Sequence, residues 1–357
     1  MSELSTSVEG ELADEAGVER VAGVPALPPR RRRKVVELGI LLLIVVVLFA
    51  APFVVNSYLL FILNLTLVYA IATLGFDILV GWSGQIGLAH AALFAIGAYG
   101  STIAVTRWEF PYLLTLPMVG VVAALFAVLI GFPAIRLTGF FLAIATLAFG
   151  FVIIEALTAA DALTGGGAGM TVDVWTLPGI TGAASTYFLT AAVGVITFLM
   201  ARRSLYGRFG RTLQTVRHLG PLAGSLGVSP LRYRLVAFSV SGAIAAVAGA
   251  LYAQLQTFIF PAMFDFNLLV PFLVMVFVGG AGSLLGPVIG AAFAVMLVEL
   301  FQDFGDLQAI AYGVALMLAI TVLPGGLVSL GSTLRSSRMI ARLTGRRAER
   351  TAVRRAQ

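Results

Sequence analysis

Long apolar runs separated by short polar connections make up most of this chain. An α-helix rises 1.5 Å per residue, so about 20 apolar residues cross a hydrocarbon core of about 30 Å. The runs are rich in Leu, Ile, Val, Phe, Ala and Gly and lack the alternation of a membrane β-strand. We therefore predict an all-α integral membrane fold, a polytopic helical bundle of about 10 transmembrane helices with broken Gly-rich segments, with spans at residues 38–56, 57–80, 88–106, 112–131, 139–158, 186–201, 235–258, 266–281, 285–303 and 307–327.

The two ends of the chain are polar. Residues 1–34 are acidic and contain several prolines, then finish in a basic run, a composition that favours disorder. Residues 331–357 are rich in arginine. We expect a disordered cytoplasmic tail with a basic juxtamembrane run at 1–34, a transmembrane domain at 35–330 and a basic cytoplasmic tail at 331–357.

Lys and Arg residues are distributed unevenly among the connections between the runs. Cytoplasmic loops of membrane proteins retain positive charge. With the N-terminus inside, every Lys and Arg except Arg107 falls on the inner side, and seven arginines fall in residues 202–234 alone. This distribution predicts an even number of spans with both termini in the cytoplasm.

Composition narrows the possible chemistry. Only 11% of the 357 residues are charged and mean hydropathy is +1.00, whereas a soluble domain is about one quarter charged. Cysteine is absent and there are two histidines, so we predict no disulfide, thiolate nucleophile or metal site. The single lysine, Lys34, lies outside any G-x-x-x-x-G-K-S/T motif, so any ATP that drives this protein is hydrolysed by another polypeptide. We expect no catalytic residues, no cofactor, no nucleic-acid partner and no enzymatic activity.

Two Gly-rich segments, 81–100 and 278–293, interrupt the apolar pattern. Non-helical backbone at membrane depth is tolerated only where it is buried in protein or lines a cavity, and paired breaks are typical of internal repeats around a pathway. One interpretation is a translocation path that involves Gly81, Gly84, Gln85, Gly87, His90, Gly279, Gly280 and Gly282. The alternative is close helix packing by small residues, with His90 as a hydrogen-bonded structural residue.

The largest predicted inner loop, residues 202–234, is broken at Gly220-Pro221 and at Ser229-Pro230. Its arginines are explained by the positive-inside rule alone. A short helix capped by Gly227 is also expected here, and we predict that it docks to a cytoplasmic partner through exposed Leu222, Ala223 and Leu226, with Arg217 nearby.

Two other features are less specific. The longest outer loop, 159–185, is rich in glycine and mildly acidic, so we expect a flexible surface that serves either as a contact site or as a solvated linker. Asp77, Glu155 and Glu299 are the main ionisable residues within the spans. Intramembrane charge is costly and commonly functional, but we interpret all three as interfacial residues near the ends of their spans.

Five segments resemble, in matching order, the permeases of branched-chain amino-acid ABC importers, particularly the M-type subunit. The resemblance covers about residues 36–330, and in the loop 202–234 Ala223 and Gly227 match the Ala-x-x-x-Gly core of the family's coupling element. Leu219, Gly220 and Pro221 stand where the family commonly has acidic residues, and Gly87 to His90 stand where it often has Ser-Leu-Gly-His. The matching segments are GQIGLAHAALFAIGAY (84–99), RLTGFFLAIATLAFG (136–150), TGGGAG (164–169), AFSVSGAIAAVAGALYA (237–253) and VGGAGSLLGPVIGA (278–291).

The resemblance implies the permease subunit of an ATP-binding-cassette importer in a prokaryotic plasma (inner) membrane, forming the translocation path for branched-chain amino acids or a similar small solute. It also implies a second homologous permease in a heterodimer, two cytoplasmic ATPase subunits, an extracellular or periplasmic solute-binding protein and membrane lipid as partners. The alternatives are a urea or other amino-acid ABC permease, an ATP-independent secondary carrier or channel, and a membrane-embedded enzyme.

Overall fold

A computed structural model of the chain describes residues 48–134, 137, 139–179, 182–302, 310, 313–314, 317, 321 and 325–329. Two compact units are distinguished, Met1–Leu48 and Phe49–Gln357, and the account that follows concerns the second. The predicted tails 1–34 and 331–357 lie outside the described residues, as do most of the predicted spans 38–56 and 307–327.

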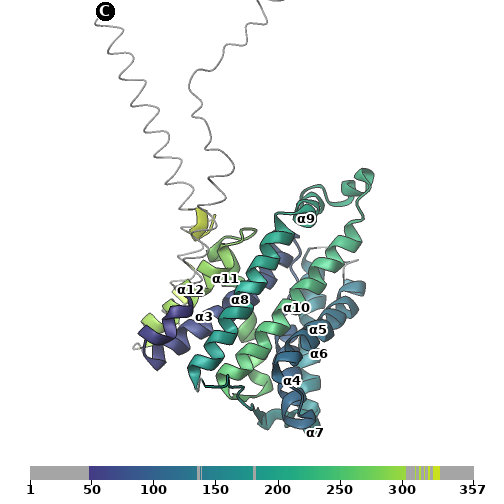
Figure 1. Ribbon diagram of the computed structural model, residues 1–357. Helices are drawn as coiled ribbons and strands as arrows, with labels where there is room; N and C mark the ends of the chain where they lie inside the picture. The colour runs from purple at the N-terminus through teal and green to yellow at the C-terminus, as the bar shows by residue number, and fades with distance from the viewer. Residues whose placement is uncertain are drawn as a thin grey trace, which may run out of the picture. The chain divides into compact units, whose positions relative to one another are not determined.

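The described part of the chain is a bundle of α-helices (Figure 1). Each of the eight predicted spans from 57–80 to 285–303 corresponds to one long helix. The elements in order are α3 (Ser57–Asp77), the π-helical turn η1 (Ile78–Trp82), α4 (His90–Trp108), α5 (Tyr112–Ala134), α6 (Phe140–Ala159), α7 (Asp161–Thr164), η2 (Gly166–Ala168), β1 (Met170–Thr171), α8 (Ala183–Leu205), α9 (Arg208–Leu219), η3 (Gly220–Leu226), α10 (Pro230–Gln256), β2 (Phe258–Ile259), η4 (Pro261–Phe264), α11 (Phe266–Gly279) and α12 (Gly286–Phe301).

Within the described residues, six helical stretches are long and apolar enough to cross a membrane, against about ten expected. The helix α4 is less apolar, because its sequence includes His90, Ser101, Thr102 and Arg107, and α12 has only 16 residues. The six stretches are Ser57–Trp82, Tyr112–Pro133, Phe140–Ala159, Ala183–Leu205, Pro230–Gln256 and Pro261–Gly279. The protein is an all-α, multi-pass membrane protein.

The helices α4 and α10 form the packed centre, with α5 and α3 against them. Small residues set the distance between α4 and α10. A Cβ added at Gly97 would lie 1.9 Å from the Ala246 carbonyl oxygen, and one added at Gly249 would lie 1.9 Å from the Phe94 carbonyl oxygen. Backbones approach this closely in membranes where glycine removes the side chain, which increases van der Waals contact between the helices.

Aromatic rings join this centre to α11. The Phe94 ring lies 5.3 Å from that of Tyr252, 6.0 Å from that of Phe264 and 5.6 Å from that of Phe272, measured between ring centroids. Tilted pairs at these distances are favourable because the positive ring edge meets the negative face of its neighbour. The cluster packs η4 and α11 against the N-terminal part of α4.

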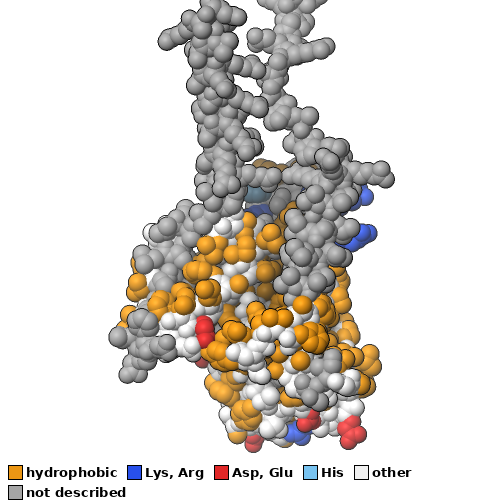
Figure 2. Space-filling view, turned by 60° about the vertical axis from the view of Figure 1, so that its left-hand side comes forward, with side chains coloured by type: hydrophobic (Ala, Val, Ile, Leu, Met, Phe, Trp, Pro, Cys, Tyr) orange, Lys and Arg blue, Asp and Glu red, His pale blue; other side chains and the backbone are white. Residues whose placement is uncertain are grey.

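Large apolar side chains on the outward faces of α5 and α6 are exposed, including Leu125, Leu129, Phe140 and Phe141. Figure 2 shows the same character on another face, where hydrophobic side chains cover much of the described surface. In water such a surface would be a large apolar patch, whereas in a bilayer it contacts lipid tails.

The loop 159–185, which we predicted to be a flexible surface on the outer side, contains secondary structure. It contains α7, η2 and β1, and β1 pairs antiparallel with β2, with Met170 opposite Ile259 and Thr171 opposite Phe258. The Gln254 side chain accepts a hydrogen bond from the Trp175 amide (2.6 Å) and donates one to the Asp173 carbonyl (3.0 Å). These contacts hold the segment against the end of α10, so in this conformation it is an ordered, packed segment.

Candidate translocation and coupling site

The helix α3 ends in a break, as the Gly-rich pattern predicted. Its last turn widens into the π-helix η1, and residues 83–89 that follow are not helical. The Ser83 amide donates to the Ile78 carbonyl (3.1 Å), the Gln85 amide to the Leu79 carbonyl (3.0 Å) and the Leu88 amide to the Thr146 hydroxyl (2.8 Å). These bonds satisfy backbone groups that have no water to bind, which is the condition for a break at membrane depth.

The segment 83–89 returns into the bundle after the break. His90, the first residue of α4, lies beside the Ala72 carbonyl. Ala72 precedes Trp82 by ten residues, which is about 15 Å along a helix. The chain therefore runs along α3 and η1 to Trp82. It then reverses direction through the non-helical residues 83–89 and begins α4 at His90, inside the bundle.

His90 is fully enclosed at this position. A carbonyl oxygen only accepts, so Nε2 carries the proton that it donates to the Ala72 carbonyl at 3.0 Å, and Nδ1 accepts from the Ser241 hydroxyl at 3.4 Å. The rings of Phe76 and Phe272 lie 4.7 and 5.4 Å from the imidazole. In this conformation His90 joins α3, α4, α10 and α11 and is buried, with no free ring nitrogen.

Gln85 makes a second set of contacts across the break. Its Nε2 donates to the Ser83 hydroxyl (2.7 Å) and to the Arg234 carbonyl (3.2 Å) at the start of α10. A Cβ at Gly87 would lie 2.7 Å from the Phe238 ring and 2.8 Å from Leu79. Both residues therefore pack the re-entrant segment against α3 and α10.

The two Gly-rich segments meet each other. A Cβ at Gly81 would lie 2.2 Å from the amide nitrogen of Gly282, so the contact needs glycine. Gly282 itself has φ +79° and its neighbour Gly280 has φ +115°, conformations that L side chains rarely adopt. A Cβ at Gly279 would lie 2.0 Å from the Gly286 carbonyl, which keeps α11 and α12 close on either side of the turn. We call this meeting point, formed by Gly81 and Gly282, the glycine crossing.

Asp77 stabilises the glycine crossing. Its Oδ1 accepts a hydrogen bond from the Gly282 amide at 2.8 Å, across 205 residues of sequence. The side chain is 1% exposed, and Oδ2 has no hydrogen-bond partner among the described residues. Asp77 lies at the end of α3, as expected, and its burial and a specific backbone donor add that it is part of the core of the site. Glu299, by contrast, lies in an exposed contact with the Tyr58 hydroxyl.

The segment 202–234, predicted to be the largest inner loop, contains the end of α8, α9, η3 and the start of α10, with breaks at the two predicted positions. Gly227 ends η3 with φ +74°, as a helix-capping glycine does. Leu222 and Leu226 are 68% and 65% exposed, whereas Ala223 is 0% exposed. The expectation that Ala223 is exposed was wrong, because the residue between two outward leucines on this short turn faces the underlying helix. We call exposed Leu222 and Leu226 the η3 knob.

Arg217 connects α9 to the glycine crossing. Its Nη1 donates to the Gly81 carbonyl, and the stem of its side chain runs beside Gly84, where a Cβ would lie 2.8 Å from Arg217 Cγ. Of the predicted path residues, Gly81 and Gly282 thus lie together with Arg217, whereas Gly87 and His90 lie elsewhere in the bundle. Among the described residues no three His, Asp or Glu side chains gather in a way that could hold a metal ion.

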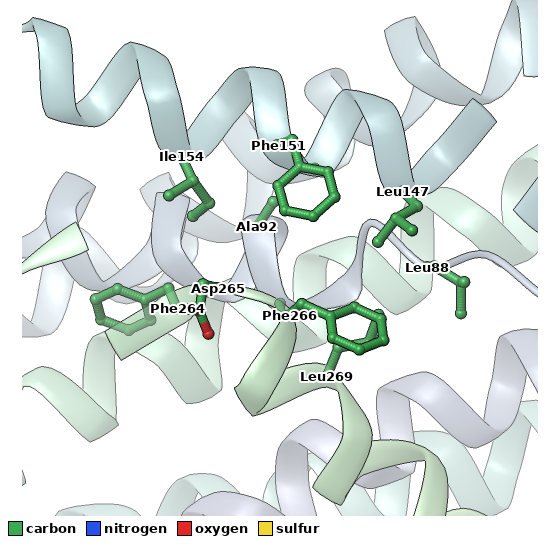
Figure 3. Close-up of a pocket in the computed structure, with 11 residues that line it drawn as sticks. Leu88, Ala92, Leu147, Phe151, Ile154, Phe264, Asp265, Phe266 and Leu269 are labelled. Carbon is green, nitrogen blue, oxygen red and sulfur yellow. The ribbon is translucent and has the colours of Figure 1, made fainter. Parts of the chain in front are cut away.

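A separate shallow crevice lies between α4, α6 and the start of α11 (Figure 3). Leu147, Phe151 and Ile154 of α6 project toward Ala92 of α4 and Leu269 of α11. Asp265 is the acidic residue in its wall, and its carboxylate already caps α11 by accepting from the Asn267 amide at 2.8 Å. The crevice is therefore an apolar gap between helices.

Sequence reasoning did not identify Asp77, Ser241 or Thr146 as residues that hold the break together. An acidic residue four positions before Gly81 on the same helix was the available signal for Asp77, since buried charge is costly and needs a reason. Ser241 and Thr146 gave no such signal, because hydroxyl residues are common in membrane helices.

Comparison with known proteins matches residues 58–323 to the family described as "Branched-chain amino acid transport system / permease component". The high-affinity branched-chain amino acid transport system permease protein LivM of Salmonella typhimurium is 31% identical, over 78% of this chain and 72% of that protein. The LivM protein of Escherichia coli is 30% identical with the same coverage. No solved structure is significantly similar to this chain. With the family match extending over every long helix described above, this chain belongs to the branched-chain amino acid transport permease family.

Proposed function

We propose that this protein is the permease subunit of an ATP-driven importer and forms the path for branched-chain amino acids. The family match over residues 58–323 carries the proposal, and the names of two relatives that are 30–31% identical support the choice of solute. Urea or another amino acid is the alternative cargo. Transport by this subunit is vectorial and forms no covalent bond.

The proposed partners are a second homologous permease, two cytoplasmic ATPases and an external solute-binding protein. The sequence has no phosphate-binding loop for ATP, so hydrolysis needs a separate subunit. The η3 knob supports docking, because two exposed leucines at the tip of a cytoplasmic loop lie beyond the helices of the bundle. Ala223, on the same turn as these leucines, is buried, and Gly227 ends η3.

The proposed mechanism is alternating access. The glycine crossing holds η1 against the α11–α12 turn through one backbone contact and one hydrogen bond that the Gly282 amide donates to Asp77. Small residues here allow two segments to separate and repack without moving bulky side chains. ATP binding by the partners moves the η3 knob, and the motion reaches the crossing through α9.

The proposed orientation places both termini and residues 202–234 in the cytoplasm of a prokaryotic cell, with the chain crossing its inner membrane. Figure 2 supports this separation of charge: acidic side chains gather near the lower end, with a basic side chain among them, and other basic groups lie at the upper right. The domain limits 1–34, 35–330 and 331–357 belong to the same proposal.

The first experiment is solute-stimulated ATP hydrolysis by the complex reconstituted in lipid vesicles. Binding proteins loaded with leucine, isoleucine, valine, aromatic amino acids or urea are compared, with and without this chain. Stimulation by branched-chain amino acids that requires this chain supports the proposal. Stimulation by urea or another solute alone replaces the cargo, and uptake that needs an ion gradient but no ATP rejects the importer.

The η3 knob gives a sharper prediction. The double substitution Leu222→Asp and Leu226→Asp places two charges where an apolar contact is proposed, so solute-stimulated hydrolysis should fall at least about tenfold, the effect of losing a contact of about 1.4 kcal/mol. Binding of the ATPase in a pull-down should fall with it. Leu231→Asp, at an exposed position on α10 outside the knob, is the matched control and should retain both. Normal hydrolysis by the double variant would reject the docking assignment.

A further inference from the structure

We propose that Arg217 is a latch that ties the cytoplasmic helix α9 to the glycine crossing and so positions the inner closure of the path. The proposal rests on the proposed transport function and adds to it the residue through which motion of the loop reaches the membrane-embedded segments. We call the contact of Arg217 with Gly81 the Arg217 latch.

The first observation is the bond itself. Arg217 lies on α9, outside the long helices, yet its Nη1 donates to the carbonyl of Gly81 at the end of η1. That carbonyl is available because the π-helical turn ends there and the Gln85 amide donates to Leu79 instead. A charged donor on a carbonyl of a broken helix is a strong and directional link between the two elements.

The second observation is the shape around the side chain. Glycine stands at three positions beside it: Gly84 under the stem, Gly81 at the tip and Gly282 on the opposite segment. A Cβ at Gly84 would lie 2.8 Å from Arg217 Cγ, and one at Gly282 would lie 3.4 Å from Nη1. Glycines of both Gly-rich segments therefore leave the space that the Arg217 guanidinium occupies, which explains why glycines cluster at this end of the bundle.

The third observation is the carboxylate of Asp77 in the same place. Its Oδ1 holds the Gly282 amide, while the buried Oδ2 has no hydrogen-bond partner in the described structure. The positive charge that acts on this carboxylate is Arg217. Trp82 of η1 lies close to the same carboxylate. Asp77 of α3 thus binds one side of the glycine crossing, at Gly282. Arg217 of α9 binds the other side, at Gly81.

Together these contacts define how the latch works. With α9 in its present position, Arg217 keeps η1 beside the α11–α12 turn and the inner end of the path stays closed. When the loop 202–234 moves, α9 withdraws the guanidinium, and the crossing retains only the hydrogen bond that the Gly282 amide donates to Asp77. The crossing then opens more readily, which links the position of the η3 knob to access from the cytoplasm.

The primary test uses the full chain in lipid nanodiscs. The protein contains no cysteine, so nitroxide labels can be attached to Gln214→Cys on α9 and Leu285→Cys beside α12 without further changes. Both positions are exposed. Pulsed electron paramagnetic resonance should give a narrow distance distribution, and Arg217→Ala should broaden it or shift it to longer distances. Arg211→Ala, an exposed arginine on the same helix, is the matched control and should leave it narrow.

The second readout is coupling in the reconstituted complex. Arg217→Ala should lower solute uptake about tenfold or more, as expected for loss of a charged hydrogen bond, while ATPase binding persists. Arg217→Lys keeps a charged donor and should recover part of the uptake. Asp77→Asn combined with Arg217→Ala should be less harmful than the sum of the two single effects, because both residues act on one crossing.

The outcomes separate the latch from the transport function. If the wild-type complex shows no solute-stimulated hydrolysis but Arg217→Ala still broadens the distance distribution, the latch stands and the proposed function fails. An unchanged distribution and normal uptake in Arg217→Ala, together with functional wild-type complex, would overturn the latch. A change of the same size in Arg211→Ala would also overturn it, since that result would reflect positive charge on α9 in general.

Discussion

Glycine serves two different purposes within one stretch of this chain. Gly97, within α4, allows that helix to touch α10. Gly81 and Gly84, before α4, allow the backbone to break and leave room for Arg217. The sequence alone offered these as competing interpretations of residues 81–100, and the structure assigns close packing to the second half of the segment and the break to the first.

The packing role predicts a steep response at one position. Gly97→Ala places a Cβ 1.9 Å from the Ala246 carbonyl oxygen, so α4 and α10 must separate and the free energy of unfolding should fall by about 1–3 kcal/mol. Gly194→Ala on α8 is the control, because its Cβ would sit 3.5 Å from Ile71 in ordinary contact. Denaturant titration in detergent micelles measures both. Equal stabilities for the two variants would contradict the packing argument.

At the scale of elements, the short strand β1 between α6 and α8 is stabilised by pairing with β2, which lies far away in the sequence. Neither β1 nor β2 exceeds two residues, and an isolated pair of that size is not stable in water. Pairing is sustained here by Gln254 and by three glycines with positive φ, Gly165, Gly166 and Gly169. The motif TGGGAG (164–169) thus forms a turn whose positive-φ glycines allow β1 to pair with β2.

Gly169 provides the test of this element. Gly169→Ala forces a side chain into φ +79° and places its Cβ 2.3 Å from the Ile259 carbonyl oxygen, so β1 should detach from β2. This backbone conformation, with φ +79° and ψ −170°, is essentially restricted to glycine and alone costs about 1–3 kcal/mol for another residue. Limited proteolysis from the outer side should cut residues 165–175 at least about fivefold faster in the variant. Gly167→Ala, with open space around it, should be cut at the wild-type rate.

For the whole molecule, the arrangement of spans fixes which loops share a side of the membrane. The segment 159–185 and the loop 202–234 are separated by one helix that is long and apolar enough to cross a membrane, α8. They must therefore lie on opposite sides. The excess of arginine in the second loop assigns it to the cytoplasm under the proposed orientation.

Cysteine labelling tests this orientation directly. With a chain that has no cysteine, Gly167→Cys should react with a membrane-impermeant maleimide in intact cells, and Gln214→Cys should react only after the cells are opened. Both positions are exposed. The reverse pattern would invert the orientation, and labelling of both in intact cells would refute a crossing by α8.

Much of the fold followed from local sequence. Each of the eight predicted spans from 57–80 to 285–303 contains a helix, and six of the helical stretches are long and apolar enough to cross a membrane, because a run of about 20 apolar residues is itself the signal for a membrane helix. The breaks at Gly220-Pro221 and Ser229-Pro230 were confirmed for a similar reason, since proline and glycine act on their own backbone. The path and coupling roles of the candidate residues stay predictions.

Other features depended on residues far apart in the chain. From the sequence alone we interpreted Asp77 as an interfacial carboxylate. Its buried hydrogen bond depends on Gly282, which lies 205 positions later in the chain. From the sequence alone we predicted that Ala223 is exposed together with Leu222 and Leu226. It is buried because of the way η3 packs in the folded chain.

The sequence by itself determined that this protein is a helical membrane protein, where its helices lie and where they break, because hydrophobicity, glycine and proline act over one or two turns. The tertiary structure decided which breaks meet, which charge is buried and which arginine reaches them. Those properties arise from contacts between α3, α9 and the α11–α12 turn, and no local pattern specifies the partner of a contact across 136 or 205 residues.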